Sequence, residues 1–284
     1  MKTGFIFKNR HSSEFDVVFK TKSRPVFPEV KCFMLDTPLT DGSYDFTDVN
    51  SDGREHYNDR AFEIIMQITG DSLTELEIKC MNISKWLTGS GELIFDSNQP
   101  VAWRGRFVSE VAFAPERKGK SAVLSAIFKA NPIGTATFNT ADGIRLSDGI
   151  RLGSTIPFNM TECFEYRLEY GLNNITVNNI GDFYIRPQFI FSEAENVTLS
   201  YKDRSIIIED LNGDLIIDTE KYLITNSLGA NLMPNMQGEF FELPSGKSYL
   251  TVYVDRECDM KVRYSPKTIY SFDFSQTEWG IADA

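Results

Sequence analysis

The best-defined periodic segment in the first half of the chain has the spacing of an α-helix. Four side chains fall at i, i+4, i+7 and i+11, on one side of a helix: Leu76, Cys80, Ile83 and Leu87. Ser72 and Glu75 have the spacing of a capping box, and Gly89 follows as a stop signal. The pattern therefore predicts one helix over about residues 72–88, with an apolar side that must pack on another element.

Strand periodicity surrounds this helix. Residues 61–69 (AFEIIMQIT) alternate between apolar and polar side chains, as a strand with one buried face does. Three further segments have the same character: 92–95 (ELIF), 103–108 and 121–130 (SAVLSAIFKA). The region up to about residue 131 is therefore predicted to be β-structure with one covering helix.

The second half of the chain has strand patterns and no segment that predicts a helix. Residues 162–170 (ECFEYRLEY) alternate strictly, and residues 248–254 (SYLTVYV) and 260–264 (MKVRY) predict further strands. Strands without helices bury their apolar faces by packing two sheets together. This half is therefore predicted to be a β-sandwich.

Three local signals mark turns or irregularities in these strands. Asn212-Gly213 lies between two apolar runs within residues 205–219, which is a strong hairpin signal. Pro187 in FYIRPQFIF indicates an edge strand or a bulge. Residues 142–153 repeat a hexapeptide (DGIRLS, DGIRLG), which predicts a bent strand pair near a domain junction.

The length of the chain predicts two domains, each with its own hydrophobic core. At 284 residues it exceeds the usual size of a single domain. The sequence predicts a mainly β fold with two β-sandwich-like domains, residues 1–133 and 134–284. In the first domain, the helix packs on the sheet.

Charge and hydropathy narrow the class of partner. Lys and Arg number 29 and Asp and Glu number 40, so the formal net charge is −11. Such a surface disfavours nucleic acid or an anionic membrane as a tightly held partner. The first residues lack the apolar core of a signal peptide, and no apolar run approaches the length of a membrane span. We expect synthesis and retention in the cytoplasm, or release by lysis.

One loop has the spacing of a calcium site. Five residues fall at positions 1, 3, 5, 6 and 12 of such a loop: Asp48, Asn50, Asp52, Gly53 and Asp59. The segment before it is turn-like and the segment after it is strand-like, whereas an EF-hand needs flanking helices. A solvated, turn-rich loop is therefore favoured over a cation site.

No other residues predict chemistry. His11 and His56 have no nucleophile or metal ligand at a recognisable spacing. Glu165 and Glu169 lie on the polar side of a strand; a glycosidase pair stays open, because its separation is spatial. The sequence predicts no catalytic residue, cofactor or metal site.

The cysteines and the large aromatic residues are expected in cores. Four cysteines lie too far apart for a zinc or redox motif and are expected to be reduced and mostly buried: Cys32, Cys80, Cys163 and Cys258. Four aromatic residues could form a platform for a sugar: Trp86, Phe95, Trp103 and Phe107. Core packing is favoured for them, because Trp86 borders the helix stripe and Phe95 ends an apolar strand.

Several segments follow one another in a specific order along nearly the whole chain. They are DGSYDF (41–46), YNDRAFEIIMQI (57–68), ISKWLTGSGELIFD (83–96), ANP (130–132), NGDLIIDTEKYLI (212–224) and MQGEFFELPSGKSYLTVYV (236–254). Their order and spacing resemble the distal tail protein family of siphophages. Ser248-Tyr249 departs from the family's common Asn before the final strand, and the DGIRL repeat is unusual for it.

The resemblance implies a structural, non-enzymatic protein of the virion tail tip that is assembled in the host cytoplasm. Family members form hexameric rings through the N-terminal domain, and a galectin-like or carbohydrate-module-like C-terminal domain projects outward. One ring face joins the tail tube protein and the other a hub or fibre protein, and the outer domain can hold receptor-binding proteins. DNA only passes through the channel, where an acidic lumen would repel it. Trp86 and Leu87 would then hold the helix end against residues 92–95, while edge strands pair with neighbouring copies.

Two alternatives belong to other classes of protein. A carbohydrate-binding module would expose an aromatic platform for a host cell-surface glycan, with Tyr166, Tyr170 and Tyr253 as candidates. A glycoside hydrolase on a sandwich scaffold would place two carboxylates across a cleft.

Overall fold

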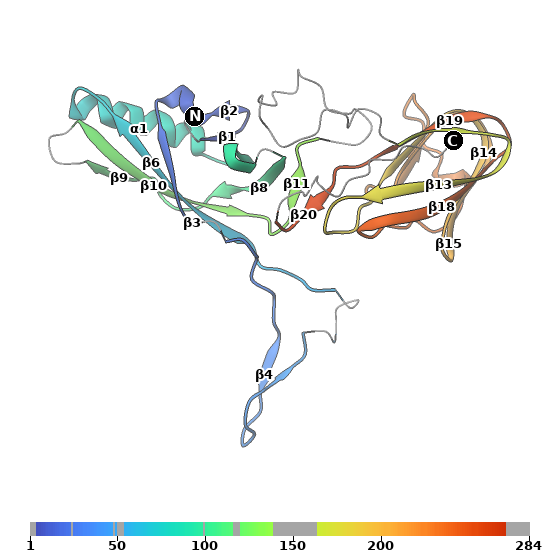
Figure 1. Cartoon of the computed structure of the whole chain (residues 1–284), viewed down its shortest axis with the longest axis horizontal. Helices are drawn as coiled ribbons and strands as arrows, with labels where there is room; N and C mark the ends of the chain where they lie inside the picture. Colours follow the sequence, from blue (N-terminus) through green and yellow to red (C-terminus); the bar gives the residue numbers. More distant parts are fainter. Residues whose placement is uncertain are drawn as a thin grey trace. The chain divides into compact units, whose positions relative to one another are not determined.

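Most of the predicted periodic segments form the expected elements. The computed structural model describes residues 4–23, 25–47, 49, 54–98, 100–115, 120–138 and 164–270. In these residues the fold is mainly β with one α-helix, and neighbouring strands pair antiparallel. The chain divides into two units, residues 1–134 (unit 1) and 135–284 (unit 2). Figure 1 shows their elements.

Unit 1 is a sheet with one covering helix. Its elements are β1 (Phe5–Phe7), β2 (Arg10–His11), a 3-10 helix (Ser12–Phe15), β3 (Val18–Ser23), β4 (Met34–Asp36), β5 (Ser43–Asp45), β6 (Arg60–Thr69), α1 (Leu73–Leu87), β7 (Ser90–Phe95), a 3-10 helix (Asp96–Asn98), β8 (Val101–Phe107), β9 (Ala112–Pro115) and β10 (Ser121–Ala130). The sheet has the order β2-β1-β7-β8-β10-β6-β3, and β9 also pairs with β10. β4 and β5 form a separate two-stranded sheet. The four strands predicted around the helix are β6, β7, β8 and β10.

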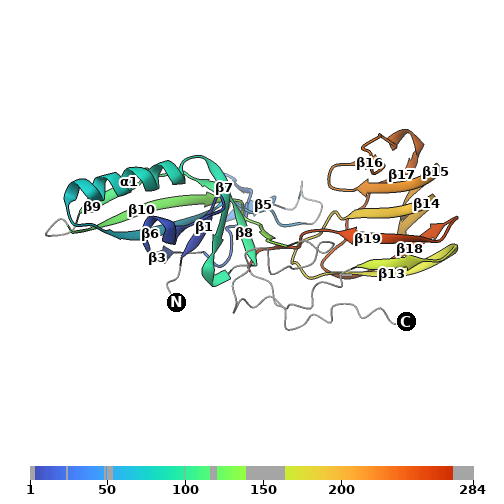
Figure 2. The same cartoon turned by 90° about the horizontal axis from the view of Figure 1, so that it is seen from above.

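The helix begins and ends as its sequence predicts, with one difference. Ser72 Oγ accepts the Glu75 amide at 3.2 Å, but the Glu75 carboxylate accepts the amide of Asp71, at 2.8 Å, instead of that of Ser72. Gly89 follows α1 with a φ of 87°, which glycine adopts without strain. Three of the four stripe residues are buried and Cys80 is half-buried. Figure 2 shows α1 lying over one face of the sheet.

Trp86 joins α1 to the first strand. Its ring stacks on Phe5 with centroids 5.3 Å apart and on Phe15 at 4.3 Å. Its indole Nε1 donates to the backbone oxygen of Phe7 at 2.9 Å. Because β1 pairs with β7 (Phe7 opposite Leu93), this contact holds the helix end against the predicted 92–95 strand.

Unit 2 is built from strands, as its periodicity predicts. After β11 (Gly134–Ala136), which lies at the boundary, its elements are β12 (Glu165–Leu168), β13 (Gly171–Asn179), β14 (Gln188–Tyr201), β15 (Arg204–Asp218), β16 (Leu223–Thr225), a 3-10 helix (Met233–Asn235), β17 (Met236–Gly238), β18 (Gly246–Val254), β19 (Cys258–Arg263) and β20 (Lys267–Thr268). Of the predicted strand at 162–170, residues 162 and 163 lie outside the described residues, and the structure forms strand only over β12. The repeat at 142–153 lies outside the described residues. Pro187 directly precedes β14.

The long hairpin of β14 and β15 belongs to both halves of a sandwich. The first part of β14 pairs with β19 and the last part with β18, while β15 follows β14 along its length. Between these parts the register shifts twice, after Phe191 and after Glu195. Phe241 packs against Phe189 at 6.2 Å and Tyr201 at 5.7 Å, one residue from each part of β14. The bulged corner thus lets one strand pair continue from one layer into the other.

The hairpin predicted at Asn212-Gly213 is wrong. Both residues lie inside β15, and the turn is at Lys202 and Asp203, between paired Tyr201 and Arg204. Gly213 has a φ of 131° and pairs with Ala194, where the register shifts. A glycine adopts a positive φ without strain both in a hairpin turn and in a β-bulge. The Asn-Gly pair therefore does mark a positive-φ position, but the structure has a bulge there and not a turn.

We predict that Gly213→Ala destabilises unit 2 by about 1–2 kcal/mol, because alanine disfavours the positive φ. The cause is the backbone alone, since nothing lies within 4 Å of an added Cβ. Native-state hydrogen exchange of the β14 and β15 amides measures this change separately from unit 1. Asp203→Ala, in the exposed turn, is the control, with an expected effect within about 0.5 kcal/mol. Equal protection in the two variants would contradict the bulge argument.

Candidate functional site

Two of the residues weighed for chemistry, His11 and Glu165, make side-chain contacts within the fold. His11 Nε2 lies 3.1 Å from Asp96 Oδ2, and His11 Nδ1 accepts the Ser13 amide at 3.1 Å, so the ring caps a 3-10 helix. Glu165 pairs with Lys261 at 2.6 Å on neighbouring strands. In the described part of the chain, no three His, Cys, Asp or Glu side chains are grouped as a metal site needs.

The loop with the spacing of a calcium site, which the sequence favoured as a solvated turn-rich loop, can be located only in part. Asp48, Asn50, Asp52 and Gly53 of its pattern lie outside the described residues, and so does Cys163. Asp59 is described and pairs with Lys129 at 3.4 Å.

No described helix is long and apolar enough to cross a membrane.

The cysteine prediction is wrong for Cys32, which is exposed. Cys80 is half-buried and Cys258 is buried, and the three described cysteines carry free thiols. Burial raises the pKa of Cys258 to about 11, and the neighbouring Asp259 carboxylate adds to the rise. Cys32 is exposed because it lies on a segment that leaves the sheet.

The aromatic residues considered as a sugar platform belong to the core of unit 1. Trp86, Phe95 and Trp103 are buried, with Phe62 packed edge-on against Phe95 at 5.6 Å and Trp103 at 5.4 Å. Phe107 packs against Phe128 at 5.1 Å. Their side chains stabilise the sheet, as the sequence favoured.

The segment between β3 and β6 leaves the sheet as a projecting arm. We define the arm as residues 25–59, of which 25–47, 49 and 54–59 are described. Its two chains are joined by Lys31 N to His56 O (2.8 Å) and Asn58 N to Glu29 O (2.7 Å), and then by the β4–β5 pairing. Figure 1 shows the arm extending from the ends of β3 and β6. The sequence pattern indicated only a turn before residue 48, although two short apolar segments flank Asp41-Gly42.

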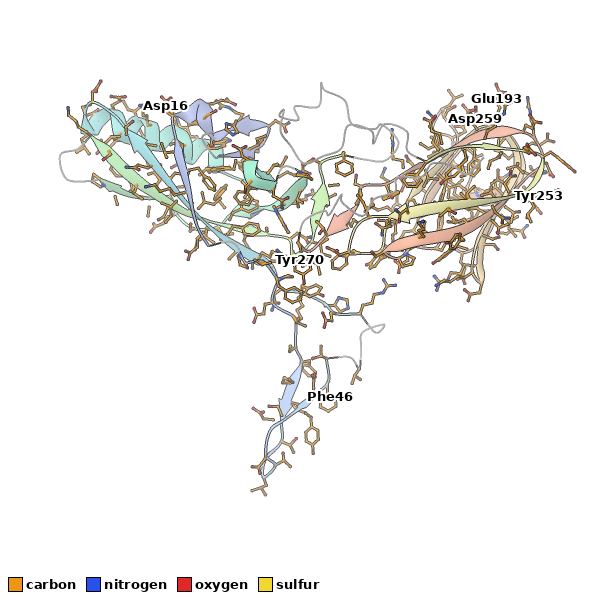
Figure 3. All side chains as sticks on the ribbon, viewed as in Figure 1. Asp16, Phe46, Glu193, Tyr253, Asp259 and Tyr270 are labelled. Carbon is orange, nitrogen blue, oxygen red and sulfur yellow. The ribbon has the colours of Figure 1, made fainter. Side chains whose placement is uncertain are left out.

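One face of the arm is apolar and exposed. Leu35 lies opposite Tyr44, and Phe33 receives the backbone hydrogen bond of Phe46, so these four side chains share a face. The rings of Phe33 and Phe46 are 6.3 Å apart. Every side chain from residue 31 to 46 is exposed, including Phe46 in Figure 3. A two-stranded hairpin cannot bury such a face by itself, which marks the arm as a contact surface.

The tip of the arm has an unfavourable local structure. Leu39 has a φ of 68° and a fully exposed side chain. The left-handed conformation costs a leucine about 1–2 kcal/mol, and the exposed side chain recovers none of it inside the chain. An external contact for Leu39 would explain both features.

The root of the arm is anchored to the sheet by Arg60. The Arg60 guanidinium is buried, lies 4.6 Å from the centre of the Trp103 ring, and donates to the backbone oxygens of Pro25 (3.2 Å) and Val26 (3.3 Å). At the same root Phe27 packs edge-on against Tyr57 at 5.5 Å. These contacts fix where the arm leaves the sheet.

The sheet face away from α1 is partly open. The odd-numbered residues of β6 and β10 point to it, among them Ile65 and Ile127, which are partly exposed. Together with the chain between β8 and β9 they line a shallow depression of about 300 Å³, which Glu63 and Glu110 border. Unit 1 therefore presents an apolar projection and an open sheet face on which Ile65 and Ile127 lie among polar and charged side chains.

Comparison with known proteins identifies this architecture. No protein-family model matches the sequence, and no curated protein matches it. The crystal structure of the SPP1 Dit protein, described as a paradigm of the hub adsorption apparatus in phages that infect Gram-positive bacteria, matches over 93% of this chain and 98% of its own, with a TM-score of 0.64 and 13% identity. The chain has the fold of the SPP1 Dit protein. Two structures of the phage P2 baseplate in its activated conformation, with Ca and with Sr, are similar at the much lower TM-scores of 0.36 and 0.35. The identity is 10% in both, over 92% of this chain and 97% of theirs.

Proposed function

We propose that the protein is a structural subunit of a phage tail tip, in which six copies form a ring that joins the tail tube to the baseplate hub. The exposed apolar face of the arm is the observation that supports it most directly. The Dit-like fold over nearly the whole chain agrees with this role. In this proposal the protein is located in the virion and carries out no reaction.

The arm and the open sheet face can join copies of the chain head to tail. The arm of one copy would place Phe33, Leu35, Tyr44 and Phe46 against the open face of the next, where Ile65 and Ile127 are partly exposed. Such a contact uses two different patches of one chain, and repeated rotation closes a ring. The edge strand β3 adds backbone groups that a neighbouring copy could pair with.

In this proposal, the two sides of the ring bind different tail proteins. One side would take the tail tube protein, and the other a hub or fibre protein, with receptor-binding proteins on unit 2. The net charge of −11 would make six subunits repel the DNA that passes between them.

We predict that Phe33→Asp combined with Leu35→Asp abolishes self-association. Two carboxylates in the contact would have to lose their hydration without partners, which an interface does not tolerate. Size-exclusion chromatography with light scattering measures the change: the wild type is expected at a multiple of 32.3 kDa and the variant at 32.3 kDa.

The matched control is Leu228→Asp, which introduces the same charge at a leucine that is 92% exposed in unit 2. It is expected to keep the wild-type mass. A wild-type protein that stays monomeric at all concentrations, or an arm variant with the wild-type mass, would reject the arm as the contact.

A further inference from the structure

The outward side of β13 and β18 in unit 2 carries tyrosines among neutral polar side chains. Four opposed pairs point away from the core, and three of them consist of neutral residues: Leu172 with Tyr253, Asn174 with Thr251, and Thr176 with Tyr249. The residues between them point inward and are buried: Ile175, Val177, Leu250 and Val252. We call these six outward residues the tyrosine face. Tyr249 is 72% exposed and Tyr253 is 37% exposed.

The six residues of the tyrosine face carry no charge, and one charged side chain borders them at each end: the exposed Lys247 on β18 beyond Tyr249, and Asp255 beside Tyr253. Its neutral surface continues onto β14, where Thr198 lies opposite Tyr253 and Ser200 opposite Thr251. Both continue the line of hydroxyl side chains, and both are half-exposed. A neutral surface offers hydrogen bonds without attracting or repelling an ionic ligand.

The Tyr253 ring is held in place before any ligand binds. Its hydroxyl bonds to Asp255 and to Tyr170, and the hydrogen bond to the Asp255 carboxylate raises the pKa of Tyr253 to about 12. Asp255 in turn accepts the Asn196 amide at 2.9 Å. Figure 3 shows Tyr253 on the outer side of unit 2. A side chain held in its bound orientation loses less entropy when it binds.

We propose that the tyrosine face binds a neutral oligosaccharide. A tyrosine ring offers an apolar surface to the C–H side of a pyranose, and the amide of Asn174 and the hydroxyls of Thr251 and Ser200 match sugar hydroxyls. Tyr249 and Tyr253 are four residues apart on one strand, a separation of about 13 Å, so the ligand spans more than one sugar ring. This binding goes beyond the assembly role and does not depend on it.

The composition of the tyrosine face differs from that of the arm. The arm presents contiguous Phe, Leu and Tyr side chains, which suit the apolar core of a protein interface. On β18, Thr251 separates the two tyrosines and leaves a polar site between two stacking surfaces. Alternating stacking and hydrogen-bonding groups suit the alternating apolar and hydroxyl surfaces of a sugar chain.

Tyr166, also considered for a platform, does not belong to this face. It is half-buried in β12, and its hydroxyl donates to the backbone oxygen of Thr176 at 2.5 Å. Burial raises the pKa of its phenol. Tyr166 therefore supports β13 from the core side.

The test is binding of the full chain to an array of neutral and acidic oligosaccharides, followed by titration calorimetry with the neutral oligosaccharide retained best. Tyr249→Ala and Tyr253→Ala are each expected to weaken binding about tenfold, because each removes one stacking surface. Tyr222→Ala is the matched control, since Tyr222 is 52% exposed in the same unit and lies outside the face. It is expected to bind as the wild type does.

Three binding results would overturn the proposal. They are retention of no neutral oligosaccharide, retention of acidic ones only, and equal weakening by Tyr222→Ala and the two face variants. A smaller light-scattering mass for Tyr249→Ala or Tyr253→Ala would also overturn it, because the face would then be a contact between copies. The arm variants test assembly separately, so failure of one proposal is distinguishable from failure of the other.

Discussion

Replacing Trp86 with alanine is expected to lower the free energy of unfolding of unit 1 by about 3–5 kcal/mol. The change removes a buried ring between Phe5 and Phe15 and leaves the backbone oxygen of Phe7 without its indole donor. Phe5 lies in β1, which is paired with β2 and β7, so the elements around the cavity can relax only in part. Loss of this contact should also release the end of α1 from β1.

Urea unfolding followed by tryptophan fluorescence measures this effect in a Trp279→Phe background, where Trp103 remains in unit 1 as the reporter. Met81→Ala is the control on the same helix, because Met81 is 55% exposed. Its expected effect is within about 0.5 kcal/mol. A Trp86→Ala variant with a midpoint close to that of the control would show that Trp86 does not hold α1 to the sheet.

Replacing Arg60 with methionine is expected to destabilise unit 1 by about 2–4 kcal/mol and to loosen the root of the arm. Methionine fills much of the buried volume but cannot donate to the oxygens of Pro25 and Val26. It also ends the cation–π contact with Trp103. The arm would then open more often than it does in the wild type.

Trypsin cleavage after Lys31 under native conditions reports this opening, because Lys31 lies in the arm just beyond its root. Loss of about 1.4 kcal/mol of local stability corresponds to about tenfold faster cleavage. Arg106→Met is the control, since Arg106 is exposed on β8. Equal cleavage rates in the two variants would contradict the anchoring role of Arg60.

Local periodicity was sufficient to predict those helices and strands whose secondary structure depends mainly on residues close in the sequence. The stripe from Leu76 to Leu87 and the alternation in residues 61–69 and 121–130 depend on neighbours within a few positions, so α1, β6 and β10 were predicted almost to their ends. The core role of Trp86 followed from its position beside the helix stripe. The ring against which it packs, Phe15, was not predicted, because it lies far away in the sequence, before the first long strand.

Prediction from the local sequence failed at Asn212-Gly213, because an Asn-Gly pair fits both a hairpin turn and a β-bulge. A hairpin turn and a bulge both use a glycine with positive φ, and only the partner strand distinguishes them. Ala194 lies opposite Gly213 because β14 and β15 share the corner of the sandwich. No residue near position 213 carries that information.

The sequence by itself determined the helix, most of the longer strands, the β-structure in the described part of the second half and the net charge of −11. Only the tertiary structure decided that the described residues of the arm project with an exposed apolar face, and that Tyr249 and Tyr253 share a face. The physical reason is that exposure and shared faces depend on strand register, which joins residues far apart in the chain. Leu35 and Leu250 are both apolar strand residues, but only the fold leaves one exposed and buries the other.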